Sequence, residues 1–356
     1  MNNLIKFLKE NGIKFENINE IKTLNLNYKG FTQIPTKIGL LTQLQILNLS
    51  DNHLTQIPAE IGLLTQLQQL YLFYNKLTLI PAEIGLLTQL QYLNLSNNQL
   101  TQIPTEIGLL VQLQTLYLSS NQLTQIPTEI GLLIKLQRLF LYSNQLTQIP
   151  AEMGQLSQLW HLSLSNNQLT QIPKEIGQLS TQLQTLYLFN NLLTQIPTEI
   201  DQLSQLKNLD LSNNLLTQIP TEIGQLSQLQ NLNLSNNLLT QIPLFIIYMS
   251  NLTKFYYSGN AINNLHPAIT RWLNRNKTTQ NVYNNSQSVH DHNIEKTTNE
   301  SIKKFITQHK FVQTEILTLI ENSKITEEVQ NILKSYSFCD HIHSRLNLTF
   351  AEVLLP

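Results

Sequence analysis

The side chains that could be catalytic or bind metal lie close together near the end of the chain. Cys339 next to Asp340 could form a nucleophile with an acidic neighbour, and His341 and His343 could join Cys339 as metal ligands. A tetrahedral zinc site usually draws its four ligands from two spaced clusters, and no second cluster lies at such a spacing in this sequence. Histidines near a helix end are more often solvated. We therefore expect no catalytic residue, no metal site and no cofactor.

The overall composition excludes several classes of function. The 356 residues carry a net charge of −1 and only 13% are charged, so no strong field draws the chain to nucleic acid. No run of about 18 apolar residues predicts a membrane span, and the first twenty residues lack the apolar core of a signal peptide. A single cysteine excludes an internal disulfide and favours a reducing compartment. These features together predict a cytoplasmic protein that does not bind nucleic acid.

Prolines recur through most of the chain at a nearly constant spacing. They lie at positions 35, 58, 81, 104, 127, 150, 173, 197, 220 and 243. The step is 23 residues everywhere except once, where an extra residue at Ser180-Thr181 makes it 24. Written as one unit, the pattern is LxxLxLxxNxLTQIPxEIGxLxx. A fixed period of this length predicts stacked repeats rather than an ordinary globular core.

The unit has a physical interpretation. Leu93 and Leu95 alternate with polar residues, which predicts a short strand with its leucines on one face. Asn98 follows at a turn, where its amide can both donate to and accept from the backbone. Pro104 should fix φ for a short helix or 3₁₀ segment over residues 105–110, and Gly108 should let this segment end or pack closely. One repeat cannot bury its own leucines, so neighbouring repeats must stack.

This unit resembles the leucine-rich-repeat family, in the 23-residue intracellular form of Ras-suppressor-like, scribble-like and plant Ras-group proteins. The resemblance covers residues 21–265 in eleven repeats. It implies an α/β solenoid, a right-handed leucine-rich-repeat horseshoe with a parallel β-sheet on the concave face and short helical or 3₁₀ segments on the convex face. It also implies that side chains between the structural leucines bind a partner.

The ends of the array depart from the repeat as caps would. Lys29 replaces the turn asparagine in the first repeat, and aromatic residues replace leucines in the last. Trp272 lies in a segment suited to closing the second end. We predict an N-terminal helical cap (residues 1–20), leucine-rich repeats (21–265), a C-terminal cap (266–274), a polar linker (275–300) and a small α-helical tail (301–356).

Variation on the predicted concave face is concentrated in repeats three to eight. Most repeats are nearly identical, but these six replace small polar residues with rings, an arginine and a histidine. Such residues are typical of binding hot spots. We predict that the partner-binding residues are Tyr71, Phe73, Tyr74, Tyr92, Tyr117, Arg138, Phe140, Tyr142, His161, Tyr187 and Phe189. Asn48, Ser50, Asn233 and Ser235 would form a polar rim on either side of them.

Two alternatives accompany this prediction. Rings facing each other across strands also stabilise a sheet without any partner. Trp160, one residue before its strand, could flank the predicted band or pack at the edge of its repeat. On the convex side a row of glutamates, such as Glu106, could meet a basic partner. The preference for acidic residues at a helix start explains that row more simply.

The tail permits a comparison with bacterial effector ubiquitin ligases, which join leucine-rich repeats to a helical domain with a Cys-x-Asp site. Here Cys339 and Asp340 are adjacent, the repeats are longer, and the predicted tail is too short for that domain. Apolar residues at helical spacing after residue 301 predict a small helical module instead.

Three functions remain open from sequence. The first is a non-enzymatic scaffold in the cytoplasm, or in the host cytoplasm if the source is a virus or parasite, that binds a protein or peptide on its concave face. The resemblance implies small GTPases or signalling enzymes as clients. The second is an effector whose repeats select a target while the tail recruits or carries an activity. The third is an assembly element that binds copies of itself.

Overall fold

The computed structural model describes residues 9–10, 12, 17–179 and 182–275 of the chain. All of these residues belong to the first of the chain's two units, residues 1–281. Most of the predicted N-terminal cap lies outside the described residues. So do the predicted linker after Arg275, the predicted helical tail, and Cys339, His341 and His343.

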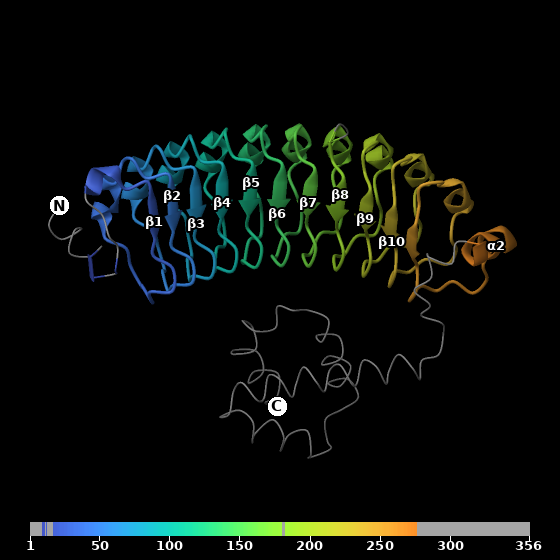
Figure 1. Cartoon of the computed structure of the whole chain (residues 1–356). Helices are drawn as coiled ribbons and strands as arrows, with labels where there is room; N and C mark the ends of the chain where they lie inside the picture. The colour runs from blue at the N-terminus through green and yellow to red at the C-terminus, as the bar shows by residue number, and fades with distance from the viewer. Residues whose placement is uncertain (1–8, 11, 13–16, 180–181, 276–356) are drawn as a thin grey trace, which may run out of the picture. The chain divides into compact units, whose positions relative to one another are not determined.

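A single parallel sheet runs along the described array, and its strands lie in sequence order (Figure 1). Neighbouring strands pair in a constant register, such as Leu93 with Leu116. Each strand is three residues long: Thr23–Asn25 (β1), Ile46–Asn48 (β2), Gln69–Tyr71 (β3), Tyr92–Asn94 (β4), Thr115–Tyr117 (β5), Arg138–Phe140 (β6), His161–Ser163 (β7), Thr185–Tyr187 (β8), Asn208–Asp210 (β9), Asn231–Asn233 (β10) and Lys254–Tyr256 (β11). The repeats therefore stack in register.

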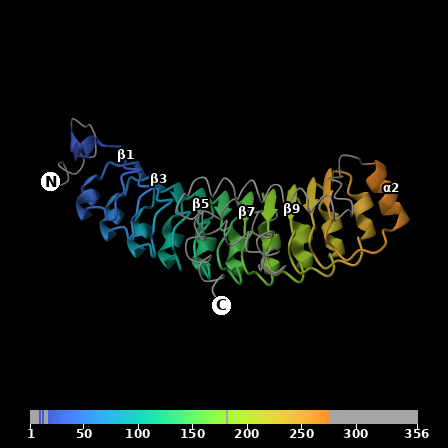
Figure 2. The same ribbon diagram turned by 90° about the horizontal axis from the view of Figure 1, so that it is seen from below.

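Short 3₁₀ helices form the opposite side of the array, and Figure 2 shows the strands on the inner side of its curve. The 3₁₀ helices are Ile18–Glu20 (η1), Thr36–Leu40 (η2), Ala59–Leu63 (η3), Ala82–Leu86 (η4), Thr105–Leu109 (η5), Thr128–Leu132 (η6), Ala151–Gln155 (η7), Lys174–Leu179 (η8), Thr198–Gln202 (η9), Thr221–Gln225 (η10) and Leu244–Tyr248 (η11), and an α-helix, Pro267–Arg275 (α2), follows β11. In this part of the chain no helix combines the length and hydropathy needed to cross a bilayer.

The repeat prolines lie just before the 3₁₀ helices rather than within them. Pro104 has φ −68° and ψ 150°, an extended conformation, and the helix η5 begins at the next residue. Its carbonyl oxygen still accepts the first helical bond, from the Ile107 amide at 3.1 Å. Helix η5 is one residue shorter than the predicted segment over residues 105–110. Pro104 precedes the helix and directs the chain into it.

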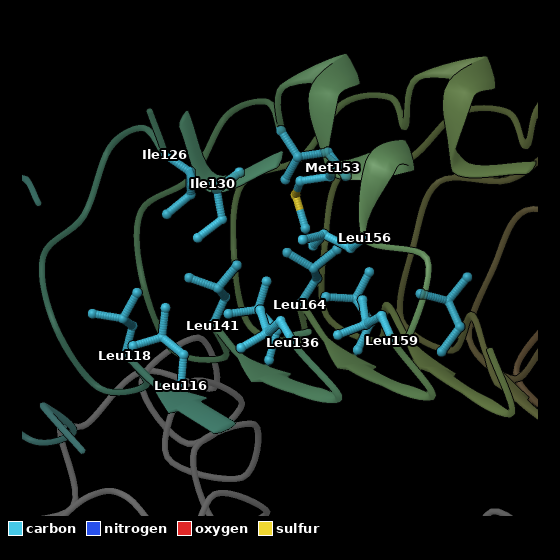
Figure 3. Close-up of a cluster of buried hydrophobic side chains, with 14 of the residues drawn as sticks. Leu116, Leu118, Ile126, Ile130, Leu136, Leu141, Met153, Leu156, Leu159 and Leu164 are labelled. Carbon is cyan, nitrogen blue, oxygen red and sulfur yellow. The ribbon is translucent and has the colours of Figure 1, made fainter. Parts of the chain in front are cut away.

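The core is one continuous stack of aliphatic side chains between the sheet and the 3₁₀ helices. In the fourth repeat Leu93, Leu95, Leu100, Ile103 and Ile107 are all buried. Figure 3 shows the same arrangement in the middle repeats, where leucines from the strands meet side chains such as Met153 and Leu156 from the convex side. Every interior repeat buries its inward-facing leucines against the repeats before and after it.

A buried asparagine joins each repeat to the one before it. The Nδ2 amide of Asn121 donates to the carbonyl oxygens of Leu95 (3.0 Å), Leu118 (3.1 Å) and Ser119 (3.3 Å). Its Oδ1 accepts the Leu100 amide at 3.0 Å. Leu95 and Leu100 belong to the preceding repeat, so one side chain satisfies backbone groups on both sides of the junction. The same bonds recur at Asn52, Asn75, Asn98, Asn144, Asn167, Asn191, Asn214, Asn237 and Asn260.

The convex glycines mark the closest approach between repeats. A Cβ placed on Gly108 would lie 2.8 Å from the backbone oxygen of Glu129 in the next repeat. A larger residue at Gly108 would need the neighbouring 3₁₀ helix to shift, so close packing explains why most repeats carry glycine here; helix η9 carries Asp201 at the same position.

The seventh repeat carries the extra residue, and the strand that follows keeps its register. Helix η8 extends over six residues instead of five, and the strand after it returns to register, with His161 opposite Thr185. Ser180 and Thr181 themselves lie outside the described residues. The insertion therefore leaves the sheet unbroken.

Helix α2 packs against the last repeats. Ile269 and Leu273 are buried, and the ring of Trp272 lies 6.2 Å from that of Phe255, which is itself buried where other repeats carry leucine. These contacts cover apolar side chains that a twelfth repeat would otherwise cover.

We predict that replacing Asn121 with alanine destabilises the array by about 3 kcal/mol. The Leu95 and Leu118 carbonyls and the Leu100 amide would lose a partner in a buried place, and each such loss costs about 1–3 kcal/mol. Urea unfolding followed by circular dichroism measures the change. Gln122→Ala, at the exposed neighbouring residue, is the control, and equal stability of the two variants would contradict the bridging role of the asparagine.

Candidate functional site

The strand geometry divides the side chains of each strand between two faces. The middle residue, such as Leu116, is buried in the core, while the first and third residues face the concave side. Because register is constant, first residues form one column along the array and third residues a second column. The residues two positions after each strand, such as Ser119, form a third.

Six of the predicted binding residues form a continuous series of ring contacts, here called the ring ladder. Its members are Tyr71, Tyr92, Tyr117, Phe140, His161 and Tyr187. Successive ring centroids lie 4.9, 5.5, 4.4, 4.8 and 5.6 Å apart. At its centre Tyr117 and Phe140 are stacked with an angle of 1° between their planes. The ladder crosses strands β3 to β8 without a gap.

The ladder is unbroken because it changes columns. Where the third strand position is small, at Asn94 and Ser163, the ring comes from the first position, as Tyr92 and His161. Where the third position carries a ring, the first position carries Gln69, Thr115, Arg138 or Thr185. Each of the six strands therefore supplies one ring. A strand that lacks a ring at its third position has one at its first position.

Arg138 and Trp160 form a second contact beside the ladder. The Arg138 guanidinium carbon lies 5.2 Å from the Trp160 ring centre, within the range of a cation–π interaction. The Trp160 ring meets His161 edge-on at 5.8 Å. Sequence reasoning left Trp160 outside the predicted site, because it precedes its strand by one residue. Its closeness to Arg138 depends on register, and a tryptophan at a position filled by glutamine in most repeats was the available signal.

The other four predicted residues lie beside the ladder rather than in it. Phe73, Tyr142 and Phe189 occupy the third column, where serines such as Ser96 and Ser165 separate them in sequence order. The rings of Phe73 and Tyr74 lie 5.8 Å apart, edge to face. Tyr74 is exposed and has φ 52°, a left-handed position that most repeats fill with asparagine or serine. The predicted set is thus one ladder with side chains along one edge.

The ladder residues are half-buried, and their environment affects two titratable groups. Burial first, and then the nearby Tyr117, raise the pKa of Tyr92 to about 12. Burial first, and then the Arg138 charge, lower the pKa of His161 from its usual value. Tyr71 donates its hydroxyl hydrogen to Gln69 Oε1 at 2.8 Å. At neutral pH the ladder is therefore an uncharged surface with several phenol groups, and Arg138 is exposed at its side.

Polar residues on both sides of the ladder already bond to each other. Asn48 Oδ1 accepts the Ser50 amide (3.0 Å) and hydroxyl (2.8 Å). Asp210 does the same for Ser212, at 2.9 and 2.6 Å. These flanks are stable in water without a partner, whereas apolar ring edges remain exposed between them. Among the described residues, no three of histidine, cysteine, aspartate and glutamate are close enough together to hold a metal ion.

Two family models match the chain. A leucine-rich-repeat region model matches residues 81–164 and 150–255, and a leucine-rich-repeat model matches residues 19–77. The chain belongs to the leucine-rich-repeat family, whose members are typically protein-interaction modules. No curated protein matches it by sequence.

The chain is also similar to several solved structures. A leucine-rich-repeat protein of Leptospira interrogans is 34% identical over 72% of this chain and 82% of that one, with a TM-score of 0.42. The ectodomain of the Arabidopsis thaliana receptor kinase GASSHO1/SCHENGEN3, solved with CASPARIAN STRIP INTEGRITY FACTOR 2, is 40% identical over 67% of this chain, with a TM-score of 0.62. The PEPR1–AtPEP1 structure is 32% identical over 71%, with a TM-score of 0.58. The chain covers only 30% and 41% of these two receptor chains.

We predict that acidification weakens the fold through His161. Because the pKa of His161 is lowered in the folded state, the unfolded chain binds more protons as pH falls below about 6.5. Stability should be complete above that pH and decline below it. Nuclear magnetic resonance titration should place the imidazole midpoint below 6.5. The free energy of unfolding of the His161→Gln variant should depend less on pH than that of the wild type. The same pH dependence in both would show that His161 does not cause the acid sensitivity.

Proposed function

We propose that this protein is a non-enzymatic binding module or scaffold that holds an extended peptide segment of a protein partner on the ring ladder. The single observation that carries the proposal is the continuity of the ladder. Six strands each supply one ring although neither column does so alone. If the rings only stabilised the sheet locally, a strand without a ring at its third position would not need one at its first position.

The orientation of the rings favours a polypeptide over a sugar or a nucleobase. Rings inside the ladder have a ring neighbour on both sides, and Tyr117 and Phe140 cover each other's faces. A sugar or base binds best on an open ring face. Ring edges and phenol groups, by contrast, suit aliphatic side chains and backbone amides.

The size of the ladder sets the length of the proposed ligand. Neighbouring strands lie about 4.8 Å apart, so six strands span roughly 24 Å. An extended peptide rises about 3.3 Å per residue and would need roughly seven residues to cover this distance. The receptor structures solved with CASPARIAN STRIP INTEGRITY FACTOR 2 and AtPEP1 support this proposal at the level of the fold.

The cellular setting belongs to the same proposal. The 23-residue period and the single cysteine favour the intracellular type of repeat and the cytoplasm. Within that setting small GTPases and signalling enzymes are candidate partners, by the family resemblance.

A displayed library of random linear peptides tests the site. Peptides selected on the wild-type chain should lose at least about 30-fold in affinity for a Tyr117→Asn/Phe140→Ser/Tyr187→Asn variant, because two or three ring contacts of a hot spot disappear. Asparagine or serine fills this column in other repeats, at Asn94 and Ser163, so the substitutions suit the fold.

The matched control is Tyr248→Asn, which removes a tyrosine exposed on η11. Fluorescence anisotropy measures the affinities, and circular dichroism checks folding. Equal affinity of wild type and triple variant, or no peptide selected by the wild type, would contradict the proposal.

A further inference from the structure

A row of exposed leucines runs along the convex side of the first half of the array. Leu40, Leu63, Leu86, Leu109 and Leu132 each end a 3₁₀ helix, and each is 43–53% exposed. Val111 and Ile134, two residues beyond the helix ends, are 43% and 54% exposed. We call these seven residues the leucine ridge.

The ridge is continuous along the array. Leucines lean over the glycine of the preceding repeat, and Leu109 Cδ1 would lie 3.0 Å from a Cβ added to Gly85. The same relation holds between Leu86 and Gly62. The ridge thus follows the repeat spacing over five successive 3₁₀ helices, η2 to η6.

The fold does not require leucine at these positions. In the second half of the array the same positions carry Gln155, Gln178, Gln202 and Gln225, all exposed. Gln155 takes the place of a ridge leucine beside Gly131, at a similar distance. Residues equivalent to Val111 and Ile134 are threonine or serine elsewhere, as at Thr88 and Ser227. Because glutamine repeats stack equally well, burial in the array does not explain why the first half keeps leucine.

We propose that the leucine ridge binds the same ridge of a second copy of this chain. The seven side chains are each about half exposed, and together they expose roughly 500 Å² of apolar surface. A stable interface buries about 800 Å² per partner, so the ridge supplies most of the area and its polar neighbours the remainder. A patch of roughly 500 Å² matches the largest apolar patch of a typical monomer, and such patches are often functional.

The charge and spacing favour a second copy over other occupants. A net charge of −1 produces little repulsion between copies. Glutamates such as Glu106 lie three residues before the ridge leucines, on the same side of each 3₁₀ helix, and disfavour an anionic bilayer. A second copy necessarily presents apolar side chains at the matching interval, and a two-fold interface uses one surface on both partners.

Pairing on the convex side would leave both ring ladders open. A dimer of this kind would bind two partner segments at once, and would hold a divalent target more tightly than one chain could. This inference stands independently of the proposed function, since it concerns the opposite face of the array.

Light scattering coupled to size exclusion tests the proposal on the full chain over about 1–200 µM. The wild type should approach twice the 40.9 kDa mass of one chain, with a dissociation constant on the order of micromolar. Leu63→Gln/Leu86→Gln/Leu109→Gln should remain monomeric over the whole range, while its circular dichroism and thermal unfolding at low concentration match the wild type.

The chain itself provides a matched control. Leu192, Leu215 and Leu238 are 41–52% exposed outside the ridge, at positions that other repeats fill with glutamine, such as Gln122. Leu192→Gln/Leu215→Gln/Leu238→Gln removes as many exposed leucines and should dimerise like the wild type. A monomeric wild type, a dimeric ridge variant, or a monomeric control variant would each overturn the proposal. A dimeric ridge variant would show that the chain associates through another surface. A foreign protein that stays bound to the wild type but not to the ridge variant would also overturn the proposal, because it would make the ridge a site for a different partner.

Discussion

The whole structure depends on the fact that one repeat cannot satisfy or bury its own groups. Its leucines need the neighbouring repeats to exclude water, and its turn leaves backbone groups that an asparagine of the next repeat must bond. Asn121 shows both sides of this constraint, since its amide bonds to Leu95 and Leu118 in adjacent repeats. With the inner half of each repeat fixed in this way, evolution is free to vary only the side chains that face outward.

Those outward side chains differ between the two faces in a way that the shared fold does not explain. On the concave face the rings change columns at β4 and β7 and so remain in contact. On the convex face leucine gives way to glutamine between η6 and η7. Both patterns distinguish one region of an otherwise uniform array: the ring ladder on the concave face and the leucine ridge on the convex face. The two faces therefore support two separate proposals, a peptide on one and a second copy on the other.

The stack of repeats could be predicted because one period recurs with little error, and the parallel sheet and horseshoe followed from the resemblance to the leucine-rich-repeat family. Sequence reasoning placed Pro104 just before the short helical segment, as the structure does, but extended that segment one residue too far, to residue 110. The set of ring residues could be predicted from the sequence. Which rings contact each other could not, because that depends on strand register and side-chain orientation. The position of Trp160 was left open for the same reason, since its contact with Arg138 crosses from one repeat to the next. Exposed leucines were hidden among structural ones, since both obey the same 23-residue period.

Tyrosine nitration read by mass spectrometry, with and without a selected peptide, tests the central claim most directly. In the free chain Tyr71, Tyr92, Tyr117 and Tyr187 should react measurably, since all are half-buried, and less than Tyr28 and Tyr248, which are 74% and 79% exposed. A bound peptide should protect the four ladder tyrosines and leave Tyr28 and Tyr248 unchanged. Protection confined to Tyr248, or no protection of the ladder at saturating peptide, would contradict the assignment of the concave face as the binding surface.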